Sequence, residues 1–596
     1  MIDPFDEVVV AQPPIGDHRL LGDGWSTALI RPDATIDWWC APAIDSPPLL
    51  WQLLDVHGPT SRWHGAEAVS TSDDVAGPGL RTTVNIGGVQ LELLDGLLHP
   101  TTGTVLVRLV RAVGEPVAVE HRMELGGFEG EAVSWDADAA GCADGLAVTI
   151  TGHGDTVAIG ATARTVLHAV PSEWRGVLVT VGETDRPTVV EAASTVESAI
   201  TTADEFASTC RLPDHGPELS VRALAVLTAC TAVASGAVVA SPTSSLPEVI
   251  GGDRQFDYRY CWQRDSAQAV AVASMLGKEE AAAALLQFLS GLGPERLLES
   301  PVFDIGGNDI PAERELLGRS GWRGSRPVRV GNGAADQVQH DVLGLVLEAI
   351  ETYSAEGATL RRSDWAIVTA FADRAVQEPG PSNGIWELRE PAMVVSADIG
   401  RWIALDRASA LVARHRHRWT GRRRRWARAA DEARRKVVDA LRSDGGLPRV
   451  YGDHGHDASA LLAVMYGLIE PDDPRATALV DATVAALGEG PFMRRYGTEV
   501  DDGFSPGEGA FVPCSWWAVS ALAITGRHDE ARERASAMLD ALGGLQSEEV
   551  EPLTGELLGN VPLVWSHSEA ARAMVILDRT CPSDSSHERR SPGLSA

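Results

Sequence analysis

The spacing of the apolar residues changes near residue 210, and this change limits the possible folds more than any other feature of the sequence. Before this point, short segments rich in valine and threonine alternate between apolar and polar residues, for example residues 82–96, 102–114 and 175–183. Period-two alternation with regular turns predicts antiparallel strands packed as a β-sandwich. After this point, alanine- and leucine-rich segments have helical spacing. The sequence therefore predicts a β-sandwich followed by a helical domain.

The second part is long enough for about eleven or twelve helices. Many of its segments are apolar nearly all round, as expected for helices that are buried on every side. A spacing of roughly 30 residues per helix and loop fits helical hairpins that pack in a ring. The predicted helical segments are residues 218–235, 264–277, 279–293, 340–355, 363–378, 433–443, 457–470, 475–489, 515–526, 528–544 and 567–579.

These patterns divide the chain, whose 596 residues are too many for one ordinary core. We predict a β-sandwich domain over residues 1–205, a linker over 206–218 and a helical domain over 219–580. Residues 581–596 are polar and rich in serine and charge, so we predict a disordered tail.

The composition excludes several classes of function. The net charge of −32 argues against binding to nucleic acid or to an anionic membrane, because long-range repulsion opposes both. No uncharged apolar run reaches the roughly 18 residues that a membrane helix needs. The N-terminal segment lacks the basic and apolar regions of a secretion signal. The 7 cysteines are scattered and odd in number, which favours reduced thiols over a disulfide framework or a zinc site. We therefore expect a cytoplasmic protein.

Two polar clusters have both a functional and a structural interpretation. Potential metal ligands lie together at Asp453, His454, His456 and Asp457. Their spacing fits no standard ligand pattern, so the favoured interpretation is a loop that ends in a helix N-cap at Asp457. Residues 414–436 are strongly basic and suit either a docking patch for an acidic partner or a second subunit, or a solvated helical surface. The solvated surface is favoured, because charge runs usually face water, and a homo-oligomer stays open as the alternative.

Two loops carry carboxylates that suit acid–base chemistry. In "NGIWELREP", Glu387 directly follows Trp386, and in "GGLQSEEVEPLTGELLGN", Glu548, Glu549 and Glu551 precede a turn. Glycoside hydrolysis uses one carboxyl group that keeps its proton and one that stays ionised. An apolar wall such as Trp386 suits the acid, because desolvation favours the neutral form. A polar, open loop suits the base, and only one of the three glutamates is expected to serve.

A third segment, "GGDRQFDYRYCWQRDS", is dense in residue types that bind sugars. Aromatic rings offer flat faces for a pyranose ring, while an arginine and an aspartate offer a donor and an acceptor for hydroxyl groups. The candidates are Tyr258, Tyr260, Trp262, Arg264 and Asp265. Each motif is a weak signal by itself, but their joint presence on loops of one helical domain favours a carbohydrate site.

Taken in order, these motifs resemble glycoside hydrolase family 15, which contains glucoamylases and bacterial trehalases. The resemblance begins at "IGDHRLLGDGWSTALIRPDATIDWWCAPAIDSPPLLWQLLD" and continues through "FDYRYCWQRD", "NGIWELRE", "GEGAFVPCSWW" and "EEVEPLTGELLGNVPLVWSH". It covers nearly the whole chain. It implies an N-terminal β-sandwich followed by an (α/α)6 barrel.

The resemblance also implies roles for individual residues. Glu387 matches the general acid, and Glu548 matches the general base, with Glu549 as the neighbouring candidate. Tyr258 matches a tyrosine that assists at the catalytic water. The residues that match the wall and the hydroxyl-binding groups of the first sugar site are Trp262, Arg264 and Asp265. The implied reaction inverts the anomeric configuration, releases β-glucose from non-reducing ends, and needs carboxyl groups roughly 6.5–9.5 Å apart.

Some positions depart from the pattern of the family. Ala397 and Asp398 stand where Ser-Lys is expected, and a lost cation with a gained anion near Glu387 would alter the sugar that is accepted. Phe256 replaces a commoner tryptophan. Two further departures are Gln263, where an aliphatic residue is commoner, and Leu563, where a glutamine is usual.

The leading hypothesis is an inverting, exo-acting α-glucoside hydrolase that acts on trehalose or short α-glucans and needs neither a cofactor nor a metal. One alternative is a hydrolase of a specialised or modified α-glycoside, motivated by Ala397 and Asp398. The other is a catalytically silent relative that only binds carbohydrate.

Overall fold

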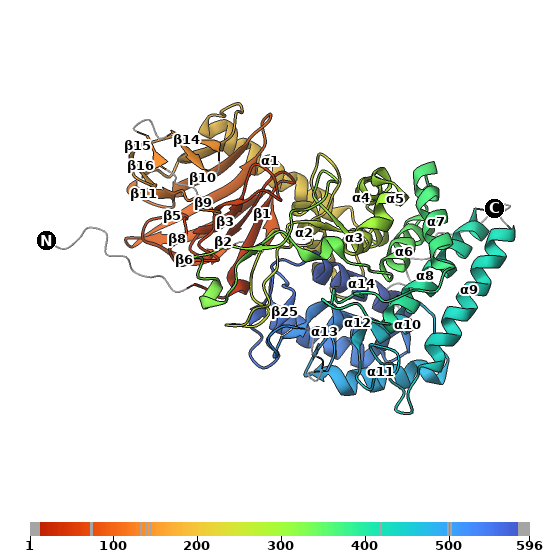
Figure 1. The fold of residues 1–596 in the computed structure, drawn as a ribbon. Coiled ribbons are helices and arrows are strands. Elements are labelled where there is room, and N and C mark those ends of the chain that lie inside the picture. Colours follow the sequence, from red (N-terminus) through yellow and green to blue (C-terminus); the bar gives the residue numbers. More distant parts are fainter. Residues whose placement is uncertain are drawn as a thin grey trace, which may run out of the picture.

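The computed structural model describes residues 12–71, 75–130, 134–136, 140–143, 145–415, 420–497, 500 and 503–581. Figure 1 shows strands gathered in one half of the molecule and helices in the other, with the N-terminal part of the chain forming the strands. This confirms the predicted order of an antiparallel β part followed by a helical part. The predicted disordered tail lies outside the described residues, apart from Cys581.

The β part consists of two sheets, which run in the order β15-β16-β11-β5-β3-β2-β1-β7 and β12-β13-β14-β17-β10-β9-β8-β6 among the described residues, with β4 added beside β3. The strand pairs are antiparallel, apart from β1 and β7. The first sheet contains β1 (Arg19–Gly22), β2 (Thr27–Ile30), β3 (Ile36–Cys40), β4 (Pro48–Leu50), β5 (Ser61–Trp63), β7 (Ala76–Gly77), β11 (Val117–Glu124), β15 (Asp155–Ile159) and β16 (Thr162–Ala169). The second contains β6 (Ala66–Thr71), β8 (Gly79–Ile86), β9 (Val89–Leu98), β10 (Thr104–Ala112), β12 (Ser134–Trp135), β13 (Ala140–Ala143), β14 (Leu146–Gly152) and β17 (Arg175–Val181).

Both faces of the central strands of the second sheet are buried. Leu93 on β9 belongs to the core cluster between the sheets, which also contains Trp39 of the first sheet. Its neighbour Leu94 points to the opposite face, because successive side chains alternate along a strand, and packs against helix α1 (Val189–Ser208). The helix begins with a capping box, in which Thr188 and Glu191 each satisfy a backbone N–H of the other.

A buried charge cluster links the first strands of the β part. Asp37 on β3 accepts a hydrogen bond of 2.6 Å from Arg31 Nε, and His18 Nε2 lies 3.0 Å from the same carboxylate oxygen. Burial by itself would raise the pKa of Asp37, but the charges of His18 and Arg31 outweigh it and hold this pKa at about 2. The folded carboxyl is therefore more acidic than in the unfolded chain.

We expect the stability provided by Asp37 to depend on pH. Because its folded pKa lies below the unfolded value near 3.8, the contribution is present above pH 4 and is lost as the pH falls towards 2. The shift corresponds to about 2 kcal/mol. In urea unfolding, Asp37→Asn should lower the stability at pH 6 and lose this difference from the wild type near pH 2. Glu173→Gln, which removes an exposed ion pair with Arg175, is the control and should show no such trend.

The helical part contains one set of helices that form a closed sequence of contacts. Each of α3, α6, α8, η4 with α10, α12 and α14 packs against the next, and α14 packs back against α3. A second set, α4, α7, α9, α11, α13 and α2, packs against these in turn. The bounds are α2 (Pro217–Ala229), α3 (Gln263–Met275), α4 (Glu279–Leu292), α5 (Pro294–Glu299), α6 (Val342–Ala355), α7 (Arg362–Ala375), α8 (Val395–Arg414), α9 (Thr420–Asp439), α10 (Leu461–Met465), α11 (Pro474–Leu487), α12 (Val512–Ile524), α13 (His528–Leu542) and α14 (Val564–Thr580).

Short elements occupy the loops. The 3-10 helices are η1 (Ile15–Asp17), η2 (Trp322–Gly324), η3 (Gly333–Asp336) and η4 (Ala458–Ala460). The short strands are β18 (Cys261–Trp262), β19 (Val302–Phe303), β20 (Arg314–Glu315), β21 (Arg329–Val330), β22 (Gly488–Glu489), β23 (Phe492–Met493), β24 (Ala510–Phe511), β25 (Glu549–Val550) and β26 (Leu557–Leu558). In the described part of the chain, no helix is both long and apolar enough to cross a bilayer.

Helix α8 is absent from the segments that the sequence predicted as helical. Its first half is buried although it contains Asp398 and Arg401, so it lacks the polar stripe and the clean apolar spacing that reveal a helix. Most of helix α12 was predicted, although it also lacks a polar face. Every residue from Val512 to Ala523 is buried, and the segment is apolar all round. Helix-period patterns identify surface helices best, because their two faces differ.

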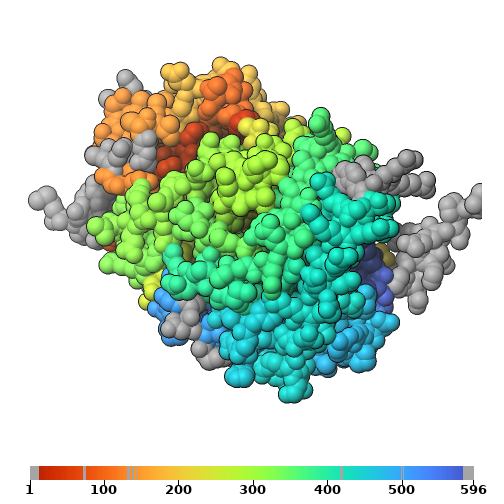
Figure 2. All heavy atoms as spheres, turned by 45° about the vertical axis from the view of Figure 1, so that its right-hand side comes forward, coloured from red at the N-terminus to blue at the C-terminus, as the bar shows by residue number. Residues whose placement is uncertain are grey.

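The basic segment 414–436 forms the end of α8 and most of α9, at the outer edge of the helical part in Figure 1 and on the surface in turquoise in Figure 2. Residues 416–419 lie outside the described part. Arg425 and the buried Trp426 both donate hydrogen bonds to Asp373 on α7. The arginines of this helix are exposed apart from the half-buried Arg434, and Trp426 packs into the interior. This agrees with the favoured interpretation as a solvated surface.

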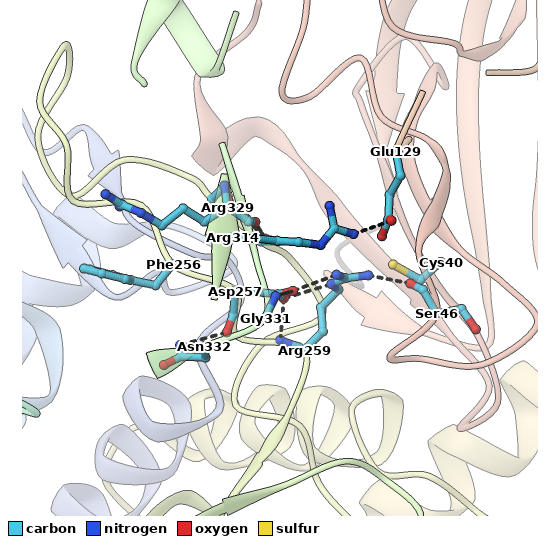
Figure 3. Close-up of polar contacts among 12 residues, drawn as sticks. Cys40, Ser46, Glu129, Phe256, Asp257, Arg259, Arg314, Arg329, Gly331 and Asn332 are labelled. Carbon is cyan, nitrogen blue, oxygen red and sulfur yellow. Dashed lines mark hydrogen bonds and ion pairs between the residues drawn. The ribbon is translucent and has the colours of Figure 1, made fainter. Parts of the chain in front are cut away.

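The two parts of the molecule contact each other through the loops that precede α3 and α6. Trp38 on β3 donates a hydrogen bond to the Pro242 carbonyl, at 2.8 Å. Arg259 holds Asp257 through two of its nitrogens and reaches the carbonyl of Ser46 in the β part, at 2.6 Å (Figure 3). This arginine lies one residue after Tyr258, so the β part supports the loop that carries a predicted site residue.

Candidate active site

One cavity contains most of the predicted site residues. It encloses about 810 Å³, including its open mouth. The residues directly before α3, α12 and α14, namely Trp262, Phe511 and Leu563, line it. Helix N-termini carry a partial positive charge, so three of them around one cavity favour negatively charged groups there. Both Glu387 and Glu548 line this cavity.

Glu387 lies in a tight turn with a left-handed backbone, at φ +57°. This conformation costs of order 1–3 kcal/mol for a residue other than glycine and is held by its surroundings. The Leu388 N–H donates to the Asn383 carbonyl, and Gln337 Nε2 donates to the Glu387 carbonyl at 2.9 Å. The side chain is 19% exposed and accepts a hydrogen bond of 2.9 Å from Arg264 Nη1. The turn therefore presents the carboxylate to both the cavity and a guanidinium.

Trp386 forms part of the apolar wall. Its ring packs against Phe511 and Trp517, with centroids 5.7 and 5.9 Å away. Its Nε1 donates to Asp457 Oδ2 at 2.8 Å, and Asp457 also accepts from the backbone of Ser459 at 2.8 Å. The predicted role of Asp457 as a helix N-cap is confirmed, and the same carboxylate fixes the tryptophan next to Glu387.

Glu548 is the one acid of its loop that lines the cavity, and its setting differs from the expected open loop. It is only 3% exposed and accepts a hydrogen bond of 2.7 Å from the Tyr258 hydroxyl. Burial is the main cause that raises the pKa of Glu548 well above 4.5, and the charge of Glu248 adds to it while Arg495 opposes it. The expectation of a solvated base was wrong, because strand β25 carries this loop into the interior beside β24.

The neighbouring acids point elsewhere. Glu549 is fully buried, accepts from the Gly509 N–H at 2.8 Å and lies 3.0 Å from Arg495 Nη2. Glu551 accepts from the N–H groups of Leu553 and Thr554 and closes a turn. Neither residue lines the cavity. Glu548 directly precedes β25 and faces the cavity, whereas Glu549 begins the strand and faces Arg495. The structure thus separates two acids that the sequence left as competing candidates.

The aromatic–arginine–aspartate segment supplies the buried end of the cavity. Tyr258 meets Trp262 edge-on, with ring centroids 5.5 Å apart. The Arg264 guanidinium lies 4.2 Å from the Trp565 ring and within 3.2 Å of Asp265. Burial raises the pKa of Asp265, although the Arg264 charge opposes this effect.

Tyr260 is the candidate that the structure does not bring to the cavity. It is buried in a small cluster with Trp262, Val302 and Ile310, and its own side chain does not line the cavity. The three aromatic residues stand at every second position of the sequence, at Tyr258, Tyr260 and Trp262. The loop before β18 is irregular, however, and the ring of Tyr260 does not face the cavity.

A buried network around Arg495 was not predicted from the sequence. Its Nη2 lies 2.7 Å from Glu248, 2.6 Å from Glu508 and 3.0 Å from Glu549. Oxygens of these three carboxylates lie within 4.8 Å of one another, and the guanidinium supplies a positive charge among them. Arg495 and Glu248 line the cavity beside Glu548. The members are far apart in sequence, so no local pattern could have identified them.

The departures from the family pattern divide into two groups. Phe256 and Leu563 line the cavity. Asp398 does not line it: it accepts from Tyr451 and pairs with Lys436 Nζ, each at 2.9 Å. Gln263 is also remote from the cavity and donates to two backbone carbonyls. Asp398 is therefore not expected to act on the sugar site, because Lys436 neutralises its negative charge outside the cavity.

Known proteins resemble this chain over most of its length. The model of the family described as "Glycosyl hydrolases family 15" matches residues 218–542. A trehalase of Mycobacterium tuberculosis is 30% identical over an alignment 615 residues long, which covers 94% of this chain and 89% of that protein. A trehalase of Mycolicibacterium smegmatis is 30% identical over 613 residues, covering 94% and 91%.

A solved structure shares the fold. A bacterial glucoamylase complexed with acarbose superposes with a TM-score of 0.67 at 12% identity, covering 96% of this chain and 94% of that one. The similarity extends over the β part and the helical part. By its family model and by relatives that match almost its full length, the chain belongs to glycoside hydrolase family 15.

Proposed function

We propose that this glycoside hydrolase is an inverting, exo-acting enzyme that releases β-glucose from trehalose or from short α-glucans. The observation that carries the proposal is the placement of two carboxylates in one cavity with different partners. Glu387 is partly open and contacts Arg264, whereas Glu548 is buried and bonded to Tyr258. The similarity to two trehalases over nearly the whole chain supports trehalose as a substrate.

Each carboxylate has a role in a single displacement. Glu387 donates its proton to the glycosidic oxygen as the bond from this oxygen to the anomeric carbon breaks. Glu548 takes a proton from a water whose oxygen bonds to the anomeric carbon from the opposite side. The leaving sugar keeps the proton of Glu387, and the product is β-glucose. The water needs space, which is why inverting enzymes hold these groups roughly 6.5–9.5 Å apart.

Tyr258 positions the base in this mechanism. Its hydroxyl bonds to Glu548 Oε1, which leaves Oε2 to accept from the water. This bond and the charge of Arg495 both favour the ionised carboxylate, against the effect of burial. Glu548 is therefore kept reactive as a base in a site that excludes most water.

The first sugar occupies the buried end of the cavity. Trp262 and Trp386 provide apolar surfaces for its ring. Arg264 and Asp265 provide a donor and an acceptor for its hydroxyl groups, and they are already held against each other. Because this end is closed by buried residues, the enzyme acts on chain ends.

We infer that the helical part is an (α/α)6 barrel. The closed sequence of contacts from α3 through α6, α8, α10, α12 and α14 back to α3 supports this inference, as does the second set of helices around it. The inner helices then deliver their N-termini to one end of the barrel, where the cavity lies.

The test is glucose release from trehalose, maltose, isomaltose and maltotriose, with the anomer followed by NMR. We expect β-glucose as the first product from at least one of these sugars. From trehalose, inversion gives one β-glucose from the attacked ring and one α-glucose as the leaving sugar. α-Glucose without β-glucose from trehalose, or α-glucose as the first monosaccharide from maltotriose, would contradict the inverting mechanism. The absence of release from all four sugars would contradict the proposed substrates.

A further inference from the structure

Four loops meet at the exposed end of the cavity, and Arg389 joins them. Its Nη2 pairs with Glu313 Oε1 at 2.9 Å, and the two side chains are 38% and 20% exposed. The guanidinium also lies 5.1 Å from the ring of Phe504 and 5.9 Å from that of Phe256. These two rings meet edge-to-face, with centroids 5.3 Å apart. All four residues line the cavity, whereas its other end is formed by buried groups.

Arg329 and Gly333 help to hold Phe256 and Arg389 in these positions. The Arg329 guanidinium lies 5.5 Å from the Phe256 ring (Figure 3). It also donates to the carbonyls of Asp253 and Gln255. Gly333 leaves the space that Arg389 occupies, because a Cβ at this position would lie 2.8 Å from Arg389 Nη1. The Arg389–Glu313 pair therefore has a defined location over the cavity.

Arg389 lies on the leaving-group side of the cavity. It follows the proposed proton donor Glu387 by two residues in the same turn, and the donor must face the oxygen of the leaving sugar. Phe256 and Phe504 offer apolar surface to a sugar ring at this location. A further ring would then meet the Arg389–Glu313 pair, which connects the turn of Glu387 to the segment before β20.

We propose that Arg389 and Glu313 form a strap that limits the leaving group to a single sugar ring. The inference rests on the proposed function and adds a chain-length limit to it, which favours disaccharides over longer glucans. An exposed ion pair stabilises a fold only slightly, so the strap can be removed with little effect on the structure.

The test compares kcat/KM for maltotriose with kcat/KM for the disaccharide that the wild type cleaves fastest. Arg389→Ala should raise this ratio about tenfold, because the path of the third ring is opened. Glu313→Gln keeps the shape of the side chain but removes its charge, and should raise the ratio in the same direction. This second variant keeps the test decisive if the first one does not fold.

The matched control is Arg314→Ala. Arg314 is the next residue after Glu313 and pairs with Glu129 of the β part, away from the cavity (Figure 3). Its loss removes a similarly exposed ion pair and should leave the ratio unchanged.

The outcomes separate this inference from the proposed function. If the wild type cleaves maltotriose as well as its best disaccharide, or if neither variant changes the ratio, the strap is refuted while the proposed function stands. If the wild type releases glucose from no α-glucoside, the proposed function itself fails.

Discussion

Glu548→Gln is expected to lower kcat on the preferred α-glucoside by about 10²- to 10⁴-fold, the usual contribution of a general base. The amide keeps the size of the side chain but cannot take the proton of the attacking water. Azide, which needs no deprotonation, should restore turnover in this variant and give a β-glucosyl azide, identified by NMR. The same loss without rescue and without any azide product would contradict a role as the base.

Two neighbours serve as comparisons for Glu548. Glu551→Gln changes an acid of the same loop that closes a turn outside the cavity, and should leave kcat nearly unchanged. Glu549→Gln changes a buried acid that faces Arg495, so its effect should appear mainly as reduced stability. If Glu549→Gln abolished turnover and Glu548→Gln did not, the assignment of the base would have to be exchanged.

The pH profile provides an independent check on the base. Burial raises the pKa of Glu548 above the ordinary 4.5. In the proposed mechanism, the enzyme is active only when this carboxyl is ionised. kcat/KM should therefore fall as the pH decreases, with a midpoint above 4.5. This acidic limb should be lost in Glu548→Gln, because glutamine does not titrate.

Glu387→Gln is expected to lower kcat on disaccharides by about 10²- to 10⁴-fold, as the loss of a general acid does. The physical reason is that a sugar alkoxide is a poor leaving group unless it is protonated. α-Glucosyl fluoride needs no such protonation, so the variant should retain far more of the wild-type rate on this substrate. In Glu548→Gln, the rates on both substrates should fall together.

The control for Glu387 is Glu390→Gln, an exposed acid three residues further along that does not line the cavity. It should leave both rates nearly unchanged. An equal loss on the disaccharide and on the fluoride in Glu387→Gln would show that this residue does not act as the proton donor.

The sequence by itself determined the two-part architecture and the loops that carry the site. Some patterns are local properties, such as the strand alternation of residues 102–114 and the helical spacing of residues 340–355. Each of them depends only on which side of a single strand or helix faces the core. The order of the motifs around Tyr258, Glu387 and Glu548 likewise sufficed to predict a carbohydrate site on the loops of the helical part.

Local sequence patterns failed to predict one helix and the surroundings of two side chains. Helix α8 escaped prediction because buried charges interrupt its apolar spacing. The expected placement of Asp398 at the sugar site was wrong, because this side chain pairs with Lys436 on the next helix and does not line the cavity. Tyr260 was grouped with two residues that line the cavity, but it packs in a buried cluster with Trp262 and does not line the cavity itself.

Only the tertiary structure decided which side chains share the cavity and in what electrostatic setting. It separated Glu548 from Glu549, buried the expected solvated base against Tyr258, and assembled Arg495 with Glu248 from segments far apart in the chain. The physical reason is that burial and charge pairing depend on where several loops converge. That convergence is set by the packing of whole helices and sheets, which no short stretch of sequence encodes.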